Sequence, residues 1–200
     1  MKIYKPIKRF LDILLSAAAL LALSPVLLLL CIICAADTHA SPLFLQERIG
    51  KGSKPFKIIK FRTMKKSAPS LTPARDIINP EEYVSPVGAW LRKTGADELP
   101  QLINIFIGQM SFVGPRPLMK TEGALHRVRA SLGVYTVRPG LTGLAQIRSS
   151  SIGSLEEKAN LDAEYVSKMS LFYDIKLLFL TATLFLCGDH IDEHFNSPLS

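Results

Sequence analysis

The longest hydrophobic stretch of the chain runs from Ile13 to Ala36, 24 residues without a formal charge. As a straight α-helix, such a stretch would extend about 36 Å at about 1.5 Å per residue, enough to cross a hydrocarbon core of about 30 Å. It is too long for the apolar part of a cleaved signal peptide, which has roughly 7–15 residues. Length alone therefore predicts a membrane-spanning helix.

Ser24 and Pro25 interrupt this stretch near its middle and favour a hairpin over a straight span. Proline removes a backbone donor and opposes the preceding helical turn, while the Ser24 hydroxyl can bond to the freed carbonyl. Each arm would then have about 12 residues and reach about 18 Å, only to the middle of the bilayer. Both flanks are basic, and the positive-inside tendency places basic flanks in the cytoplasm. A helix–break–helix that enters and leaves through one face satisfies both flanks.

Two strands and a turn follow the hydrophobic stretch. Residues 42–48 and 56–63 have strand character, and the Gly-, Lys- and Pro-containing sequence between them predicts a β-hairpin. Alternation in the second strand puts Ile58 and Lys60 on one face, so neither face is cleanly apolar. We therefore expect this strand to lie beside a charged site rather than in a core.

Helices are expected over most of the remaining chain. Apolar residues at i, i+3, i+4 and i+7 predict a helix over 99–106, and shorter or amphipathic patterns predict helices at 87–94 and 154–168. The apolar stretch 175–187 is too short to span a membrane and is expected at the interface or in the core. The fold class is therefore α+β and mostly helical, with a re-entrant N-terminal membrane segment, a small β-hairpin and interfacial amphipathic helices.

Positive charge is concentrated just after the hydrophobic stretch. The whole chain has a formal net charge of +7, but residues 41–75 alone carry +8, because nine basic residues stand against Glu47. Such a surface implies an anionic partner, which can be nucleic acid, a phosphorylated small molecule or an acidic membrane, although a solvated basic face has the same composition. Aromatic residues are not interleaved with these charges, which argues against nucleic acid.

Two short motifs resemble metal sites but are better explained otherwise. Cys31 and Cys34 lie inside the apolar run without a second pair of ligands, so we interpret them as hydrophobic filler. His190-Ile-Asp-Glu193-His194 fits a zinc-binding pattern but stands near the end of the sequence without a third ligand. We interpret it as part of a polar tail.

The most informative pair of acids is Asp97-Glu98, immediately before the predicted helix 99–106. Asp97 could simply cap that helix, with Glu98 complementing its dipole. However, Arg92 precedes the pair, and Arg116 follows it in a rigid Gly-Pro-Arg-Pro turn. A helix start attracts phosphate, and carboxylates facing arginines are typical of phosphoryl transfer with a divalent cation. One acid can then act as nucleophile while the other holds the metal.

Four motifs occur in order along the chain: Lys60-Phe-Arg-Thr-Met64, Asp97-Glu-Leu-Pro-Gln101, Gly114-Pro-Arg-Pro117 and Arg138-Pro-Gly-Leu-Thr-Gly143. With these motifs, the chain resembles the bacterial sugar transferases, small monotopic phosphoglycosyl transferases, from Lys8 to about Leu184. The resemblance implies that the protein transfers a sugar 1-phosphate from a UDP-sugar to undecaprenyl phosphate through a covalent aspartyl-phosphosugar intermediate. UMP would be released, and the reaction would be the first membrane step of glycoconjugate assembly.

The resemblance also implies roles for individual residues. Asp97 would be the nucleophile, Glu98 would bind Mg²⁺, and Ser24-Pro25 would be the break of a re-entrant membrane helix. The residues implied to contact substrate or phosphate are Lys60, Arg62, Arg92, Arg116, Arg138, Gln146, Asp162 and Asp174. Of these, Asp162 and Asp174 could equally be structural caps.

The implied organisation has three parts: a re-entrant membrane anchor at 1–40, a catalytic domain on the membrane surface at 41–187, and a polar tail at 188–200. The resemblance places the protein at the bacterial cytoplasmic (inner) membrane, with its catalytic domain on the cytoplasmic face. Expected partners are a UDP-sugar, undecaprenyl phosphate and anionic membrane lipids, and no nucleic acid. Ala96 departs from the family with little expected effect, whereas departures at Leu155 and residues 148–150 concern sugar selection. No residue specifies the sugar or an oligomeric state.

Two other functions fit part of the pattern. A polyprenyl diphosphate phosphatase would also need arginines, acids and a membrane anchor, but it would use water as acceptor and release no UMP. A basic adaptor at a membrane surface or on nucleic acid would bind in a salt-sensitive way and would not depend on Asp97. The adaptor leaves the rigid arginine turns unexplained.

Overall fold

The computed structural model describes residues 4–68, 82–148 and 153–187. The predicted tail 188–200, with its His190–His194 motif, lies outside the described residues. The helices are α1 (Tyr4–Thr38), α2 (Pro86–Thr94), α3 (Gln101–Phe106), α4 (Gly123–Ser131), α5 (Leu144–Ile147), α6 (Leu155–Lys168) and α7 (Leu171–Cys187). The strands are β1 (Leu43–Ile49), β2 (Pro55–Phe61), β3 (Ser111–Val113) and β4 (Gly140–Thr142). The predicted α+β, mostly helical fold class is confirmed.

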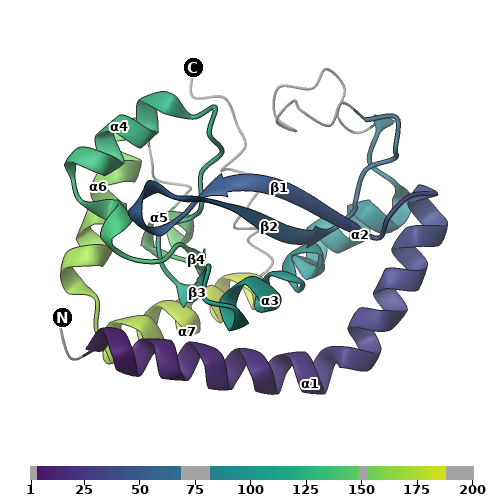
Figure 1. Ribbon diagram of the computed structural model, residues 1–200, viewed down its shortest axis with the longest axis horizontal. Helices are drawn as coiled ribbons and strands as arrows, with labels where there is room; N and C mark the ends of the chain where they lie inside the picture. Colours follow the sequence, from purple (N-terminus) through teal and green to yellow (C-terminus); the bar gives the residue numbers. More distant parts are fainter. Residues whose placement is uncertain (1–3, 69–81, 149–152, 188–200) are drawn as a thin grey trace.

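Helix α1 bends at its internal proline. Figure 1 shows the first arm running along the base of the molecule and the second arm turning up beside the rest of the chain. Pro25 cannot donate to the carbonyl of Leu21, four residues earlier, and the Ser24 hydroxyl donates to that same carbonyl at 2.8 Å. The proline therefore bends α1 without ending it, since the helix is continuous from Tyr4 to Thr38, and Ser24 compensates the lost bond as predicted. The re-entrant topology stays a prediction. By length and composition, α1 is also apolar enough to cross a membrane.

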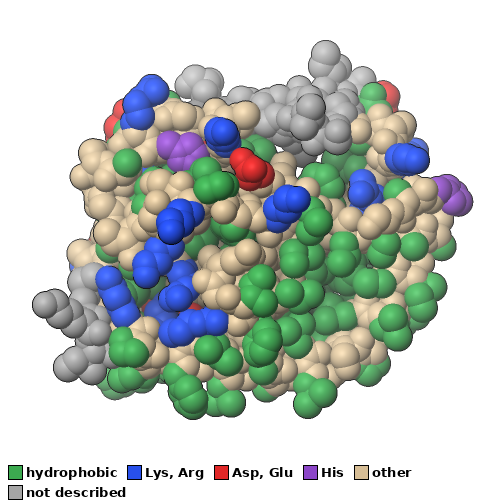
Figure 2. All heavy atoms as spheres, viewed as in Figure 1, with side chains coloured by type: hydrophobic (Ala, Val, Ile, Leu, Met, Phe, Trp, Pro, Cys, Tyr) green, Lys and Arg blue, Asp and Glu red, His purple; other side chains and the backbone are tan. Residues whose placement is uncertain are grey.

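The inner side of α1 packs on the domain, and its outer side remains apolar and exposed. Leu30 and Cys34 are buried against Phe61 and Leu91. The Cys34 side chain therefore fills an apolar core, as predicted. Leu21 on the outer side is 79% exposed. Figure 2 shows hydrophobic side chains gathered over the lower part of the molecule, where α1 lies.

Strands β1 and β2 form the predicted antiparallel hairpin, with Leu43 opposite Phe61 and Ile49 opposite Pro55. The expectation that β2 would lie outside a core is wrong for Ile58, which is 3% exposed and packs with Leu102 and Ile105. The reason is that β2 passes α3 along its middle and reaches the acid pair only at its end. One face of the strand therefore supplies both a core residue and, at Lys60, a site residue.

Strands β3 and β4 are paired in parallel, with Ser111 opposite Gly140 and Val113 opposite Thr142. Residues 140–142 of the Arg138–Gly143 motif therefore form a strand. Gly140 allows this pairing, because a Cβ at this position would lie 2.1 Å from the backbone nitrogen of Gly114. Two backbones approach here more closely than any larger residue allows. This contact joins the Gly-Pro-Arg-Pro and Arg138–Gly143 motifs.

The amphipathic patterns at the C-terminal end are confirmed as helices. Ser154 caps α6 by accepting from the backbone N–H of Glu157 at 3.1 Å. Helix α7 begins at Leu171, four residues before the predicted apolar stretch, and buries Leu177 in the core. Phe172 on the same helix is 84% exposed. The interfacial position of α7 in a membrane stays a prediction.

Candidate active site

The acid pair lies in a short 3-10 turn, η4 (Ala96–Glu98), between α2 and α3. Gly95 ends α2 in the left-handed region at φ 66°, which lets the chain reverse there. Helix α3 begins at Gln101 with Pro100 in the N-cap position and no side-chain cap. The reading of Asp97 as the cap of this helix is therefore wrong, because the 3-10 turn separates the aspartate from the first residue of α3.

Glu98 is held between two cationic side chains from distant parts of the sequence. Its Oε1 forms an ion pair with Lys60 of β2, and Nη2 of Arg116 lies 3.6 Å from the same oxygen. The Glu98 side chain is only 14% exposed. Burial raises the pKa of Glu98, but the charges of Lys60 and Arg116 outweigh burial and lower the pKa to about 2. Glu98 is therefore ionised throughout the neutral range.

Asp97 lies near a third cation, Arg92 of α2. Desolvation lowers the pKa of Arg92, whereas the nearby Asp97 carboxylate raises it, which places the two charges within electrostatic reach. The Nε of Arg92 donates to the Thr63 hydroxyl at 2.9 Å. Thr63 belongs to the Lys60–Met64 motif, so this motif contacts Glu98 through Lys60 and Arg92 through Thr63. The structure thus brings together Lys60, Arg92, Asp97, Glu98 and Arg116.

Arg129 contacts the backbone of Arg116 and was not identified from the sequence. Its Nη1 donates to the backbone carbonyl of Arg116 at 2.7 Å, and its guanidinium forms an ion pair with Asp162. Both side chains are at most 2% exposed. Asp162 therefore lies behind the Gly-Pro-Arg-Pro turn, where it compensates the charge of Arg129. The only sequence signal was spacing, since Arg129 stands one helical turn after the buried Leu125 of α4.

Three other residues of the predicted set make separate contacts. Arg62 donates from Nε to the carbonyl of Ser41 at 2.7 Å and stacks over Phe44 at 5.7 Å from the ring centroid. Gln146 donates to the carbonyl of Leu141 at 3.1 Å. Arg138 donates from Nε to the carbonyl of Gly108 at 2.7 Å. The structure does not bring these side chains into contact with the acid pair.

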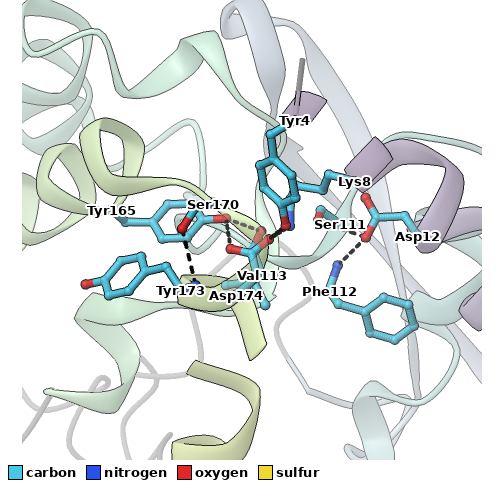
Figure 3. Close-up of polar contacts among 10 residues, drawn as sticks. All are labelled: Tyr4, Lys8, Asp12, Ser111, Phe112, Val113, Tyr165, Ser170, Tyr173 and Asp174. Atoms are coloured by element: carbon cyan, nitrogen blue, oxygen red, sulfur yellow. Dashed lines mark hydrogen bonds and ion pairs between the residues drawn. The ribbon is translucent and has the colours of Figure 1, made fainter. Parts of the chain in front are cut away.

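Asp174 fastens the beginning of α1 to the core (Figure 3). Its carboxylate accepts from the Tyr4 hydroxyl at 2.6 Å, from Lys8 at 2.5 Å and from the Tyr165 hydroxyl at 2.9 Å. Nearby, Asp12 accepts from the Ser111 hydroxyl at 3.0 Å and from a backbone N–H of β3. These two carboxylates fix α1 to α7 and β3. They form a joint that is separate from the contacts of Asp97 and Glu98.

The surroundings of the acid pair can bind an anion, and a carboxylate lies at the centre of the surrounding cations. Cations from β2, α2 and the Gly-Pro-Arg-Pro turn surround two adjacent acids that project from a short turn. Such an arrangement can bind phosphate groups next to an ionised carboxylate. Within the part of the chain that the structure describes, no group of three or more His, Cys, Asp or Glu side chains could hold a metal ion by itself.

Comparison with known proteins gives a consistent picture. Residues 3–188 match the family described as bacterial sugar transferase. The chain is 38% identical over 188 residues to the exopolysaccharide production protein ExoY of Rhizobium meliloti, covering 87% of this chain and 83% of that protein. It is 38% identical over 185 residues to the UDP-glucose:undecaprenyl-phosphate glucose-1-phosphate transferase of Escherichia coli, covering 88% of this chain.

It is also 37% identical over 184 residues to the undecaprenyl-phosphate glucose phosphotransferase of Komagataeibacter xylinus, again covering 87% of this chain. This chain spans only 39% of the Escherichia coli protein and 35% of the Komagataeibacter protein. The matched part in each case includes all four motifs and the described acid pair of this chain. The chain therefore belongs to the bacterial sugar transferase family and is an enzyme that transfers phosphate-containing groups.

Proposed function

We propose that this protein transfers a sugar 1-phosphate from a UDP-sugar to undecaprenyl phosphate through a covalent intermediate on Asp97. The observation that carries the proposal is the pair of adjacent acids in one turn, with Lys60 and Arg116 holding Glu98 and with Arg92 close enough to Asp97 for their charges to interact. The names of the Escherichia coli and Komagataeibacter relatives specify glucose and undecaprenyl phosphate. UDP-glucose is therefore the first substrate to test.

In the first step, an oxygen of the Asp97 carboxylate attacks the β-phosphorus of the UDP-sugar. A carboxylate–phosphorus bond forms, the bond from the β-phosphorus to the bridging oxygen breaks, and UMP leaves with that oxygen and its electron pair. The transferred group carries spread negative charge in the transition state, which nearby arginines stabilise. Arg92 and Arg116 are the residues that we assign to this charge.

In the second step, a phosphate oxygen of undecaprenyl phosphate attacks the same phosphorus. The new bond gives a polyprenyl diphosphate-linked sugar, and the Asp97 carboxylate is released unchanged. The enzyme therefore needs no external base to regenerate its nucleophile. Two displacements at one phosphorus explain why one carboxylate can serve both a water-soluble and a lipid substrate.

Glu98 fits the role of a magnesium ligand by its chemistry. Mg²⁺ binds one or two carboxylates together with phosphate oxygens, and Glu98 is fully ionised with only Oε1 in its ion pairs. When bound, the ion would neutralise charge on the diphosphate. Lys60 and Arg116 would orient Glu98 by holding one of its two oxygens. The proposal also includes anionic lipids as partners around α1, and it places the acid pair on the cytoplasmic side of the membrane.

The test is to incubate the purified protein with UDP-glucose labelled at the β-phosphorus and with Mg²⁺, in the absence of lipid. Wild type should become labelled and release one equivalent of UMP, and undecaprenyl phosphate should then remove the label. The variant D97N should neither label nor release UMP, while E47Q, which removes an exposed carboxylate from β1, should behave as wild type. Normal labelling of D97N would show that the nucleophile is another residue.

The same assay separates the two alternative functions. A phosphatase would release inorganic phosphate from a polyprenyl diphosphate and no UMP from the UDP-sugar. A non-enzymatic adaptor would release neither product. If glucose is not the sugar, a panel of UDP-sugars in the same assay identifies the substrate by which member releases UMP.

A further inference from the structure

A second cationic site lies at the beginning of α1, apart from the acid pair. It is an open cavity of about 50 Å³ lined by Lys5, Lys8, Asp12, Lys51, Ser111, Thr136, Val137, Arg138 and Met169. Figure 2 shows Lys and Arg side chains gathered at this place, beside the start of α1 and next to the hydrophobic surface. One water needs about 10–15 Å³ of such space, so the cavity admits a group of several heavy atoms.

The hairpin separates this cavity from the proposed catalytic centre. Lys51 lies in the turn of the hairpin, whereas Lys60 pairs with Glu98 near the far end of β2. Lys60 is five residues after Pro55 along β2, which corresponds to about 17 Å at about 3.3 Å per residue. An anion bound in the cavity therefore cannot at the same time contact Arg116 beside Glu98. The cavity is a site in its own right.

The charges that line the cavity are not balanced by the protein. Lys8 is paired with Asp174, and the Oδ1 of Asp12 accepts from Ser111 and a backbone N–H. Lys5 and Lys51 make no ion pair or side-chain hydrogen bond with any residue that the structure describes. Holding these cations near one another costs electrostatic energy that a bound anion would remove.

A further guanidinium group adds to this charge. Arg9 donates to the carbonyls of Ile105 and Phe106 at 2.7 Å each, and Arg138 donates to the carbonyl of Gly108 at 2.7 Å. The two arginines are thus held by the last residues of α3 and by the loop that follows it. Neither arginine forms an ion pair with a carboxylate in the described part of the chain.

The position of the cavity indicates which anion it meets. Three of its lining residues, Lys5, Lys8 and Asp12, belong to the first turns of the helix whose next residues form the long apolar stretch. At a membrane, the residues just before such a stretch lie at the depth of the lipid headgroups. We propose that this cavity binds the phosphate group of a membrane lipid and so holds the beginning of α1 at the headgroup layer. The proposal uses the membrane association of α1 and does not depend on the catalytic roles of Asp97 and Glu98.

The test measures lipid binding directly by native mass spectrometry of the full chain in detergent with added phosphatidylglycerol. Wild type should retain one lipid, and K5Q/K51Q should bind it about 30-fold more weakly, the factor that corresponds to roughly 1 kcal/mol for each lysine. The matched control K54Q/K57Q removes the same charge from exposed positions on the hairpin outside the cavity. Its affinity should be nearly that of wild type, and thermal unfolding should show that both variants are folded.

Competitors then identify the source of the phosphate. Displacement of phosphatidylglycerol by undecaprenyl phosphate, in wild type and not in K5Q/K51Q, would support a lipid-phosphate site and name the acceptor as its ligand. Failure of undecaprenyl phosphate to displace would support the same site with phospholipid as its ligand. The proposal would be overturned if K5Q/K51Q and K54Q/K57Q weakened lipid binding equally, or if wild type retained no lipid. It would also be overturned if inorganic phosphate displaced the lipid at the same concentration.

Discussion

The Glu98 carboxylate forms an ion pair with Lys60, a residue 38 positions earlier in the chain and on a different element. The contact fixes the end of β2 against the turn that carries both acids. Because Arg116 lies 3.6 Å from the same carboxylate oxygen, the charge of Glu98 also offsets the repulsion between the two cations. Lys60, Glu98 and Arg116 come from three of the four sequence motifs and together form one electrostatic centre.

Replacing Glu98 by glutamine should abolish most of the transfer activity with little change in shape. The amide keeps the volume of the side chain but leaves Lys60 and Arg116 without their negative partner, and it is a poor magnesium ligand. We expect the turnover rate to fall by about 10²–10³-fold, the usual cost of losing one charged contact to a transition state. The measurement is UMP release against Mg²⁺ concentration.

The control for this variant is E47Q in strand β1, which should keep the turnover rate and the magnesium dependence of wild type. A variant E98Q with the rate and magnesium dependence of wild type would show that Glu98 serves only the packing of Lys60 and Arg116. Near-ultraviolet circular dichroism of both variants should match wild type, which would separate lost chemistry from lost structure.

The pKa of Glu98 predicts how stability changes in acid. The folded protein holds this pKa at about 2, below the ordinary value of 4.5, so the contribution of the group is fully present above about pH 4.5. As pH falls toward 2 the contribution disappears, because the unfolded chain binds the proton first. The expected size is about 3–4 kcal/mol, from the difference between 4.5 and about 2 at about 1.4 kcal/mol per pKa unit.

The measurement is denaturant unfolding of wild type and E98Q in detergent at several pH values. Wild type should be the more stable at pH 6, and the difference in free energy of unfolding should shrink steadily between pH 5 and pH 2. A difference that does not depend on pH over this window would contradict the assignment of the low pKa to Glu98.

The buried pair of Arg129 and Asp162 predicts a strongly non-additive effect on stability. Removing one partner leaves a charge at a position that is at most 2% exposed, which costs about 3–5 kcal/mol. We therefore expect R129M and D162N each to destabilise the protein by about that amount. The double variant R129M/D162N should be more stable than the sum of the two single changes predicts, since no buried charge remains.

A double-mutant cycle in urea measures this coupling. Its matched control is the pair formed by Glu164 and Lys168 of α6, which is exposed and one helical turn apart. Removal of that pair should change stability by only about 0.3–0.5 kcal/mol. If the single changes at Arg129 and Asp162 simply add, the two groups do not act as one ion pair.

The sequence indicates local structure well and long-range contacts poorly. The bend at Pro25, the hairpin and α6 follow from residues that lie next to one another, because proline, turn residues and a serine cap act within a few positions. The pairing of β3 with β4 could not be predicted, since each strand has only three residues and no alternating pattern. What selects that pairing is the missing side chain of Gly140, whose effect depends on a backbone 26 residues away.

The candidate site divides in the same way. The resemblance to the family indicated Lys60, Arg92, Asp97, Glu98 and Arg116, and the structure places these residues in one group. It also indicated Asp162 and Asp174, but a resemblance in sequence does not show what a side chain contacts. Asp162 faces Arg129, and Asp174 faces Tyr4, Lys8 and Tyr165. A buried arginine such as Arg129 has no sequence pattern of its own, because the same residue on an exposed helix face would look identical.

The bend in α1 predicts the topology of the anchor and how to change it. A re-entrant helix places positions 3 and 45 on the same side of the membrane, whereas a straight helix over the whole apolar stretch would place them on opposite sides. In a background without native cysteines, I3C and L45C should therefore react with a membrane-impermeant thiol reagent from the cytoplasmic side only. Leu45 is 53% exposed, so a cysteine there is within reach of the reagent.

Straightening the helix should reverse part of this result. In P25A the alanine restores the backbone donor to the Leu21 carbonyl and removes the steric cause of the bend, which makes a spanning helix accessible. We expect I3C to become reactive from the periplasmic side in a fraction of the P25A molecules. The variant S24A keeps the proline and should keep the topology of wild type. Labelling of the two positions from opposite sides in the wild-type background would instead show that α1 spans the membrane despite its bend.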